Sequence, residues 1–214
     1  MSKYIFLDFN GTIIDDVDLC LDLLNDILRN QNKRLVTKEQ YKDIFTFPVK
    51  KYYELAGIDF SIEPFESLAD KFIVAYQPAS LKCGLYPNSV EAFQKLKMKG
   101  YHLVILSASE RNNLLEQCES FGIVPYFDAI LGIDNIHAAS KVGIALKFME
   151  ENHIKGKDVL FVGDTLHDLE VAKAMGARCM LVACGHQSTN VLKQGGVPIL
   201  PNVYALVELL EDVE

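Results

Sequence analysis

Short, continuous runs of apolar residues recur along the whole chain, and small or acidic residues follow them. Five runs have the length of strands: 4–7, 102–106, 129–131, 159–162 and 179–182. Unbroken hydrophobicity, as opposed to alternation, is typical of strands buried on both faces of a parallel sheet. Amphipathic stretches lie between these runs, and a glycine follows each of them: 89–99, 112–121, 142–152 and 168–175. The pattern predicts an α/β fold with a Rossmann-like, mostly parallel sheet.

The segment 16–80 breaks this alternation. It carries apolar residues at helical spacing, such as Leu19 and Leu23, and it contains no convincing strand. An acidic turn precedes it, and a stretch with proline and glycine but little periodicity follows it. We therefore expect a core of residues 1–15 and 81–214, with a helical cap of residues 16–80 inserted into it.

Composition limits the classes of partner. The 214 residues carry a formal net charge of −8, whereas nucleic acids and anionic membranes attract basic surfaces, so neither is an expected partner. The first residues lack the pattern of a signal peptide, and no apolar run reaches the roughly 18 residues of a membrane span. The five cysteines are odd in number and scattered, which favours reduced thiols. We expect a cytoplasmic monomer or homodimer.

Polar residues collect at the ends of the predicted strands. Asp8 ends the first run, Ser107 ends the second, and Asp164 and Asp168 follow the fourth, while Lys141 opens a helical stretch. Ligands of open parallel sheets bind beyond these carboxyl ends. Carboxylates gathered there repel one another unless a cation lies among them, and Mg²⁺ prefers carboxylates, waters and phosphate oxygens. The sequence therefore predicts a Mg²⁺ site at this edge of the sheet.

Gly11 and Thr12 follow Asp8. Glycine frees the backbone to turn sharply, and successive N–H groups in such a turn can bind an anion. We expect these two residues to contribute to a phosphate-binding turn.

Four motifs resemble, in order, those of the haloacid dehalogenase-like hydrolases. The string Asp8-Phe9-Asn10-Gly11-Thr12 resembles the first motif, usually written D-x-D-G-T; Ser107 resembles the second, Lys141 the third, and Gly163-Asp164-x-x-x-Asp168 the fourth. The resemblance runs from residue 4 to about residue 183. The insertion resembles the C1 type of helical cap found in phosphoglycolate phosphatase-like members.

The resemblance implies a mechanism. Asp8 is expected to attack phosphorus in line and form an aspartyl-phosphate that water hydrolyses. Ser107 and the N–H of Ala108 are expected to hold the phosphoryl oxygens, and Lys141 to neutralise charge. The implied Mg²⁺ ligands are Asp8, the backbone carbonyl of Asn10, Asp164 and Asp168. A closing cap leaves room for a small phosphorylated metabolite, such as phosphoglycolate or a sugar phosphate.

Asn10 departs from the family pattern. Phosphatases of the family carry an aspartate there, which protonates the leaving group and later deprotonates water. An amide does neither, so a contribution of about 10²–10⁴ in rate is expected to be missing. Several alternatives stay open: a slow phosphatase, one whose proton comes from water or a cap side chain, cleavage of a phosphonate or haloacid, phosphate binding with regulation but little turnover, and an engineered substitution.

Overall fold

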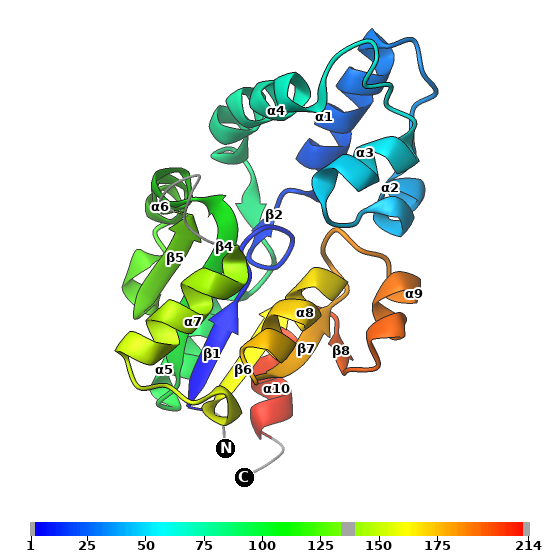
Figure 1. The fold of residues 1–214 in the computed structure, drawn as a ribbon. Helices are drawn as coiled ribbons and strands as arrows, with labels where there is room; N and C mark the ends of the chain where they lie inside the picture. The colour runs from blue at the N-terminus through cyan, green and yellow to red at the C-terminus, as the bar shows by residue number, and fades with distance from the viewer. Residues whose placement is uncertain (1–2, 134–139, 212–214) are drawn as a thin grey trace.

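A central parallel sheet organises the protein. A computed structural model describes residues 3–133 and 140–211, and it places six strands in the order β5-β4-β1-β6-β7-β8, all parallel to their neighbours (Figure 1). The strands are β1 (Tyr4–Leu7), β4 (His102–Glu110), β5 (Ala129–Ile133), β6 (Val159–Gly163), β7 (Arg178–Val182) and β8 (Ile199–Leu200). The predicted α/β class with a mostly parallel sheet is confirmed.

Helices cover both faces of the sheet. Successive side chains of a strand point to opposite faces, and both faces of this sheet are apolar. Ile5 and Leu7 of β1 pack in one buried cluster with residues of three helices, whereas Phe6 packs in a second cluster on the other face. The first face is covered by α5 (Ser89–Met98), α6 (Arg111–Ser120) and α10 (Tyr204–Glu211); the second by α7 (Lys141–Glu151), α8 (Leu166–Ala174) and the short α9 (Thr189–Leu192).

Residues 17–80 form four helices with a hydrophobic cluster of their own, and we call them the helical unit. The helices are α1 (Val17–Asn30), α2 (Lys38–Ile44), α3 (Val49–Ala56) and α4 (Phe65–Ser80). Figure 1 shows the unit beyond the carboxyl ends of the strands. A two-stranded antiparallel pair, β2 (Ile14–Asp15) and β3 (Gly84–Leu85), lies where the chain enters and leaves it. The boundaries of core and cap given above stay a prediction.

The second strand is longer than its apolar run. β4 continues past Leu106 to Glu110, and its pairing with β5 shifts register between these two residues. Ser107 therefore lies inside the strand, within the stretch where the register shifts. Among the described helices, none is both long and apolar enough to cross a membrane.

Candidate active site

The sheet topology brings Asp8 to the centre of the candidate site. β1 lies between β4 and β6, with Leu7 paired to Ile105 on one side and to Val162 on the other. Asp8 comes one residue later, and its N–H donates to the carbonyl of Val162 at 2.9 Å. Asp8 thus lies level with the end of β6 and next to the part of β4 that carries Ser107.

Lys141 joins two of the predicted carboxylates. Its Nζ lies 2.5 Å from Oδ1 of Asp8 and 2.6 Å from Oδ1 of Asp168. Lys141 is the first residue of α7, which Ser140 caps by accepting from the N–H of Gly143. The lysine is only 5% exposed, so these ion pairs are shielded from water.

Asp168 is fixed by the start of α8. Thr165 is the N-cap residue, and it forms a capping box with Asp168: Thr165 Oγ1 accepts from the N–H of Asp168, while Oδ2 of Asp168 accepts from the N–H of Thr165 at 3.0 Å. Thr165 Oγ1 also lies 2.7 Å from this Oδ2. One carboxylate oxygen of Asp168 therefore belongs to the N-terminal cap of α8, and the other pairs with Lys141.

Asp164 is packed among backbone groups. Its Oδ2 accepts from the N–H of His186 at 2.6 Å, and its Oδ1 accepts from Oγ1 of Thr12 at 3.3 Å. A Cβ at Gly11 or Gly185 would approach within 2.3 Å and 2.2 Å of Oδ2 of Asp164, respectively. Gly11 also has a φ of +67°, a left-handed conformation that favours glycine. Both glycines are needed for the backbone to approach this carboxylate.

The acidic cluster carries an excess of buried negative charge. Oxygens of Asp8, Asp164 and Asp168 lie within 4.8 Å of one another, and Lys141 pairs with two of the three side chains. Burial raises the pKa of Asp8 well above its ordinary value, although Lys141 opposes the shift, and burial raises the pKa of Asp164 to about 6. Burial acts upward on Asp168 too, but Lys141 and Thr165 outweigh it and lower its pKa. Three hard oxygen donors with surplus charge fit a divalent cation such as Mg²⁺.

Asn10 is held by three side chains. Its Nδ2 donates to Oδ2 of Asp16 at 2.9 Å and to the hydroxyl of Tyr76 at 2.6 Å, and its Oδ1 accepts from Oγ of Ser109 at 3.2 Å. Tyr76, from α4, also donates to Oδ2 of Asp16 at 2.7 Å. The amide at the atypical position is therefore fully used within the protein.

Asp16 forms a buried ion pair with His186. Nε2 of His186 lies 3.2 Å from Oδ1 of Asp16, and the two side chains are 4% and 0% exposed. Burial acts to lower the pKa of His186, but Asp16 outweighs it and raises the pKa to about 9. Burial acts to raise the pKa of Asp16, but His186 and the hydrogen bonds of Asn10 and Tyr76 hold it below its ordinary value. Both groups are charged at neutral pH.

The expected phosphate-binding groups lie around the same strand ends. The N–H of Gly11 donates to Oδ1 of Asp16 at 2.9 Å, and that of Thr12 donates to the carbonyl of Phe9 at 3.3 Å. Both groups are thus used inside the turn, and their contact with phosphate stays a prediction. Ser107 is 1% exposed, with its Oγ accepting from the N–H of Ser109, whereas Ala108 is exposed.

Three residues of the site were missed by sequence reasoning. Asp16 was interpreted as part of an acidic boundary turn, and neither Tyr76 nor His186 was singled out. Asp16 was within reach, because it follows the first motif closely, directly after Asp15 in an acidic turn. Tyr76 and His186 belong to no strand-end motif, so only the folded structure brings them to Asn10 and Asp164.

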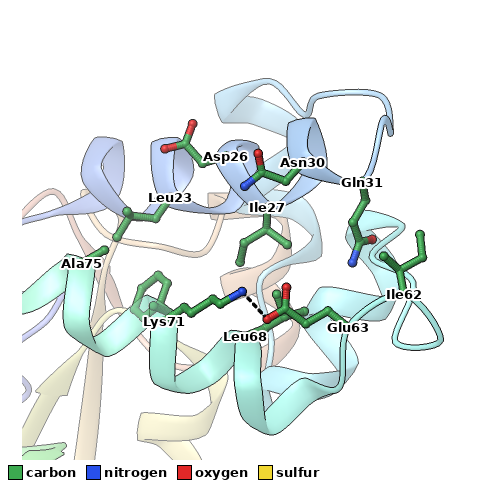
Figure 2. Close-up of a pocket in the computed structure, with 11 residues that line it drawn as sticks. Leu23, Asp26, Ile27, Asn30, Gln31, Ile62, Glu63, Leu68, Lys71 and Ala75 are labelled. Atoms are coloured by element: carbon green, nitrogen blue, oxygen red, sulfur yellow. Dashed lines mark ion pairs between the residues drawn. The ribbon is translucent and has the colours of Figure 1, made fainter.

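A cavity of about 250 Å³ lies away from this site, between α1 and α4 in the helical unit (Figure 2). Leu23, Ile27 and Leu68 contribute apolar walls, and Lys71 pairs with Glu63 at 2.6 Å. None of the predicted site residues lines it.

The chain is similar to several named phosphatases and to a solved hydrolase structure. Probable phosphatase IndB of Dickeya dadantii is 21% identical over 216 residues, which cover 97% of this chain and 92% of that protein. A phosphoglycolate phosphatase of Nitrosospira multiformis is 22% identical over 98% of this chain and 96% of its own length. The fold is similar to that of a haloacid dehalogenase-like hydrolase from Streptococcus pneumoniae, with a TM-score of 0.82 at 15% identity over 98% of both chains.

The sequence model of one family matches most of the chain. It describes the haloacid dehalogenase-like hydrolases, and it matches residues 4–182, from β1 through β7. The matched stretch includes Asp8, Ser107, Lys141, Asp164 and Asp168. The family and the hydrolase class expected from the motifs are thereby confirmed, and the chain belongs to the haloacid dehalogenase-like hydrolases.

Proposed function

We propose that this hydrolase is a Mg²⁺-dependent phosphatase of a small phosphorylated metabolite. One observation carries the proposal: Nζ of Lys141 bridges Asp8 and Asp168, within a cluster of three buried carboxylates that includes Asp164. A nucleophile, a fixed cation and surplus acidic oxygens at one strand edge match the needs of phosphoryl transfer, which depends on positioning and charge stabilisation.

In the proposed reaction, a carboxylate oxygen of Asp8 attacks the phosphorus of the substrate. A bond forms between that oxygen and phosphorus, and the bond from phosphorus to the ester oxygen breaks. The ester oxygen keeps the electron pair, takes a proton from solvent and departs as the alcohol. A water oxygen then bonds to the phosphorus of the aspartyl-phosphate, the bond from phosphorus to the Asp8 oxygen breaks with its electron pair restoring the Asp8 carboxylate, the water gives a proton to solvent, and inorganic phosphate is released.

Lys141, Ser107 and Ala108 stabilise the transferring group in this proposal. Lys141 already contacts Asp8, so its charge opposes the negative charge that accumulates on the phosphoryl oxygens. Ser107 and the N–H of Ala108 lie on the neighbouring strand β4, where they can donate to the same oxygens. Gly11 and Thr12 belong to the turn that follows Asp8, and in this proposal they contribute to phosphate binding.

The carboxylates of Asp8, Asp164 and Asp168, with the backbone carbonyl of Asn10, would hold the Mg²⁺ ion. Bound there, Mg²⁺ supplies positive charge that offsets the charge of the phosphoryl group. Thr12 and the N–H of His186 orient Asp164, and Thr165 orients Asp168, so both carboxylates are held before a cation binds.

The helical unit serves as the cap in this proposal. It lies beyond the carboxyl ends of the strands and contributes Tyr76 to the surroundings of Asn10 (Figure 1). A lid over the site favours a small substrate, and relatives named phosphoglycolate phosphatase make 2-phosphoglycolate the first compound to test, with sugar phosphates next. We place the enzyme in the cytoplasm, as a monomer or homodimer.

A specific observation favours a second candidate, a phosphate-binding regulatory protein with little turnover. Both N–H groups of Asn10 donate within the protein, to Asp16 and Tyr76, and an amide is not a general acid at neutral pH, so this position offers no proton to a leaving group. The first candidate is preferred because Lys141 contacts Asp8, the proposed nucleophile.

Phosphate release tests the choice directly. Purified protein, Asp8→Asn and Asp15→Asn are assayed with Mg²⁺ on 2-phosphoglycolate and sugar phosphates. Asp15 is an exposed carboxylate outside the acidic cluster and serves as the matched control. We expect release by the unaltered protein and Asp15→Asn, and none by Asp8→Asn. Release that survives Asp8→Asn refutes the assignment of the nucleophile, and phosphate binding without release supports the regulatory candidate.

A further inference from the structure

On one side, His186 contacts two residues of the helical unit. Its Nδ1 lies 2.8 Å from the hydroxyl of Tyr41 in α2, and its ring stacks on Phe45, with centroids 4.8 Å apart and planes 21° apart. Tyr41 is 0% exposed and His186 is 3% exposed. A tyrosine hydroxyl both donates and accepts, so this contact persists in either protonation state of the ring.

On its other side, the same residue contacts the acidic cluster. Its backbone N–H donates to Oδ2 of Asp164 at 2.6 Å, and its Nε2 lies 3.2 Å from Asp16. Asp16 in turn accepts from the N–H of Gly11 and from Nδ2 of Asn10, both at 2.9 Å. His186 thus touches both the helical unit and the residues that set the position of Asp164 and the first motif.

The packing leaves His186 little freedom. A Cβ built on Gly11 would meet Cδ2 of His186 at 2.5 Å, and one built on Gly185 would meet Asp164 at 2.2 Å. The loop that carries His186 is therefore pressed against Asp164 and the turn after Asp8. Because the ring is closely packed, it cannot move without displacing these neighbours.

We propose that His186 is a positioning residue that couples docking of the helical unit, through Tyr41 and Phe45, to the placement of the Asp164 carboxylate. The inference rests on the proposed function, since it assigns Asp164 to the metal site. When Tyr41 and Phe45 hold the ring, its backbone N–H keeps Asp164 aimed at the cluster. When the helical unit is displaced, this hydrogen bond loosens and the site binds its cation less tightly.

A neighbouring contact provides the control. Lys42, the residue after Tyr41, donates from Nζ to the carbonyls of Ala183 at 3.1 Å and Cys184 at 3.4 Å. It joins the same helix to the same loop, but none of its hydrogen bonds reaches Asp164 or Asp16. Lys42→Met therefore removes one contact between this helix and this loop while the contacts of Tyr41 and Phe45 with His186 stay in place.

The experiment measures Mn²⁺ binding to metal-free protein by electron paramagnetic resonance, with melting temperature as a check on folding. Tyr41→Phe removes one hydroxyl and keeps a buried ring, and we expect it to weaken Mn²⁺ binding about 2- to 10-fold, the equivalent of one hydrogen bond. His186→Gln keeps a donor near Asp16 but loses the ring, and we expect a loss of about 10-fold or more. Lys42→Met should change binding less than about 2-fold.

Double variants sharpen the test. Because Tyr41 acts through His186, Tyr41→Phe should add almost nothing in the His186→Gln background, whereas Lys42→Met should have the same small effect in either background. The inference is overturned if Tyr41→Phe leaves Mn²⁺ affinity unchanged, or if Tyr41→Phe and His186→Gln act additively. If His186→Gln does not fold, the comparison of Tyr41→Phe with Lys42→Met decides alone.

The readout separates this inference from the proposed function. Mn²⁺ binding needs no substrate, so an unaltered protein that binds Mn²⁺ but releases no phosphate refutes the function and still tests the link. Conversely, if the enzyme is active but Tyr41→Phe has an unchanged Mn²⁺ affinity, the proposed function stands and the coupling through His186 is refuted.

Discussion

Asn10 and Asp16 form a complementary pair in which an amide donates and a carboxylate accepts, across 2.9 Å. The same carboxylate accepts from Tyr76 and pairs with His186. A carboxylate at position 10 would instead face Asp16 at the same distance, with no hydrogen between them. The atypical residue at position 10 is therefore matched to its buried neighbour.

This pairing predicts that Asn10→Asp, without a change at Asp16, will destabilise the protein. Asn10→Asp should lower the free energy of unfolding by about 1–3 kcal/mol, because a buried hydrogen bond is replaced by repulsion. The exchange variant Asn10→Asp with Asp16→Asn should recover most of that loss and release phosphate faster than Asn10→Asp. Urea unfolding and phosphate release measure both effects. Equal stability of Asn10→Asp and the unaltered protein would contradict the pairing.

Lys141 supplies the second prediction at this scale. Lys141→Met leaves Asp8 and Asp168 buried without their cation, so we expect a loss of about 3–5 kcal/mol in unfolding free energy, partly recovered by Mg²⁺. Lys147→Met is the matched control on the same helix, where an exposed pair with Glu151 at 3.9 Å should contribute less than about 1 kcal/mol. A similar loss in both variants would show that Lys141 is not stabilised by the carboxylates.

At the scale of elements, the start of α8 joins folding to chemistry. Thr165→Ala should cost about 0.5–2 kcal/mol, because the capping box is lost, and should also reduce phosphate release, since Asp168 loses its anchor. Thr37→Ala removes the matching box of α2, formed with Gln40, and should cost similar stability with no loss of activity. Equal effects of the two variants on activity would refute the special role of the α8 cap.

Asp128 gives a prediction about pH at the start of β5. It pairs with Lys97 at 2.9 Å and accepts from the N–H of Leu103 at 2.9 Å; burial opposes the shift, but these contacts hold its pKa below 3.8. A lowered pKa stabilises the fold above the unfolded value and stops doing so as pH falls through the folded value. Asp128→Asn, which keeps an acceptor for Leu103, should therefore destabilise the protein at about pH 7 and destabilise it less at about pH 3. Urea unfolding at both pH values checks this, and a constant difference would contradict it.

Most of the parallel sheet could be predicted from the sequence. Strands such as β1 and β6 are unbroken apolar runs, and such runs indicate burial on both faces. The end of β4 could not. Its last residues are polar, and only pairing with β5 after a register shift keeps them extended. The short β8 also carries too few residues to produce a periodic signal.

At the scale of the whole molecule, the residues of the candidate site fall into two groups. Asp8, Lys141, Asp164 and Asp168 were predicted because a parallel sheet brings its strand ends to one edge, whatever the loops do. Tyr76 and Tyr41 could not be predicted in the same way, because their place depends on how the helical unit docks on the core. His186 lies in the loop after β7, four residues beyond the end of the apolar run, where the sequence carries no motif. Tyr76 of the helical unit contacts Asn10, and Tyr41 contacts His186, so the helical unit contributes to the site itself.

The central claim is that Asp8 carries the phosphoryl group during turnover. Borohydride reduces an acyl phosphate to an alcohol, so protein quenched with it during hydrolysis should contain homoserine at position 8, found by peptide mass spectrometry. We predict this product only with both substrate and Mg²⁺, and not in Asp8→Asn. Steady phosphate release without any modification at position 8, or with modification at another carboxylate, would contradict the account.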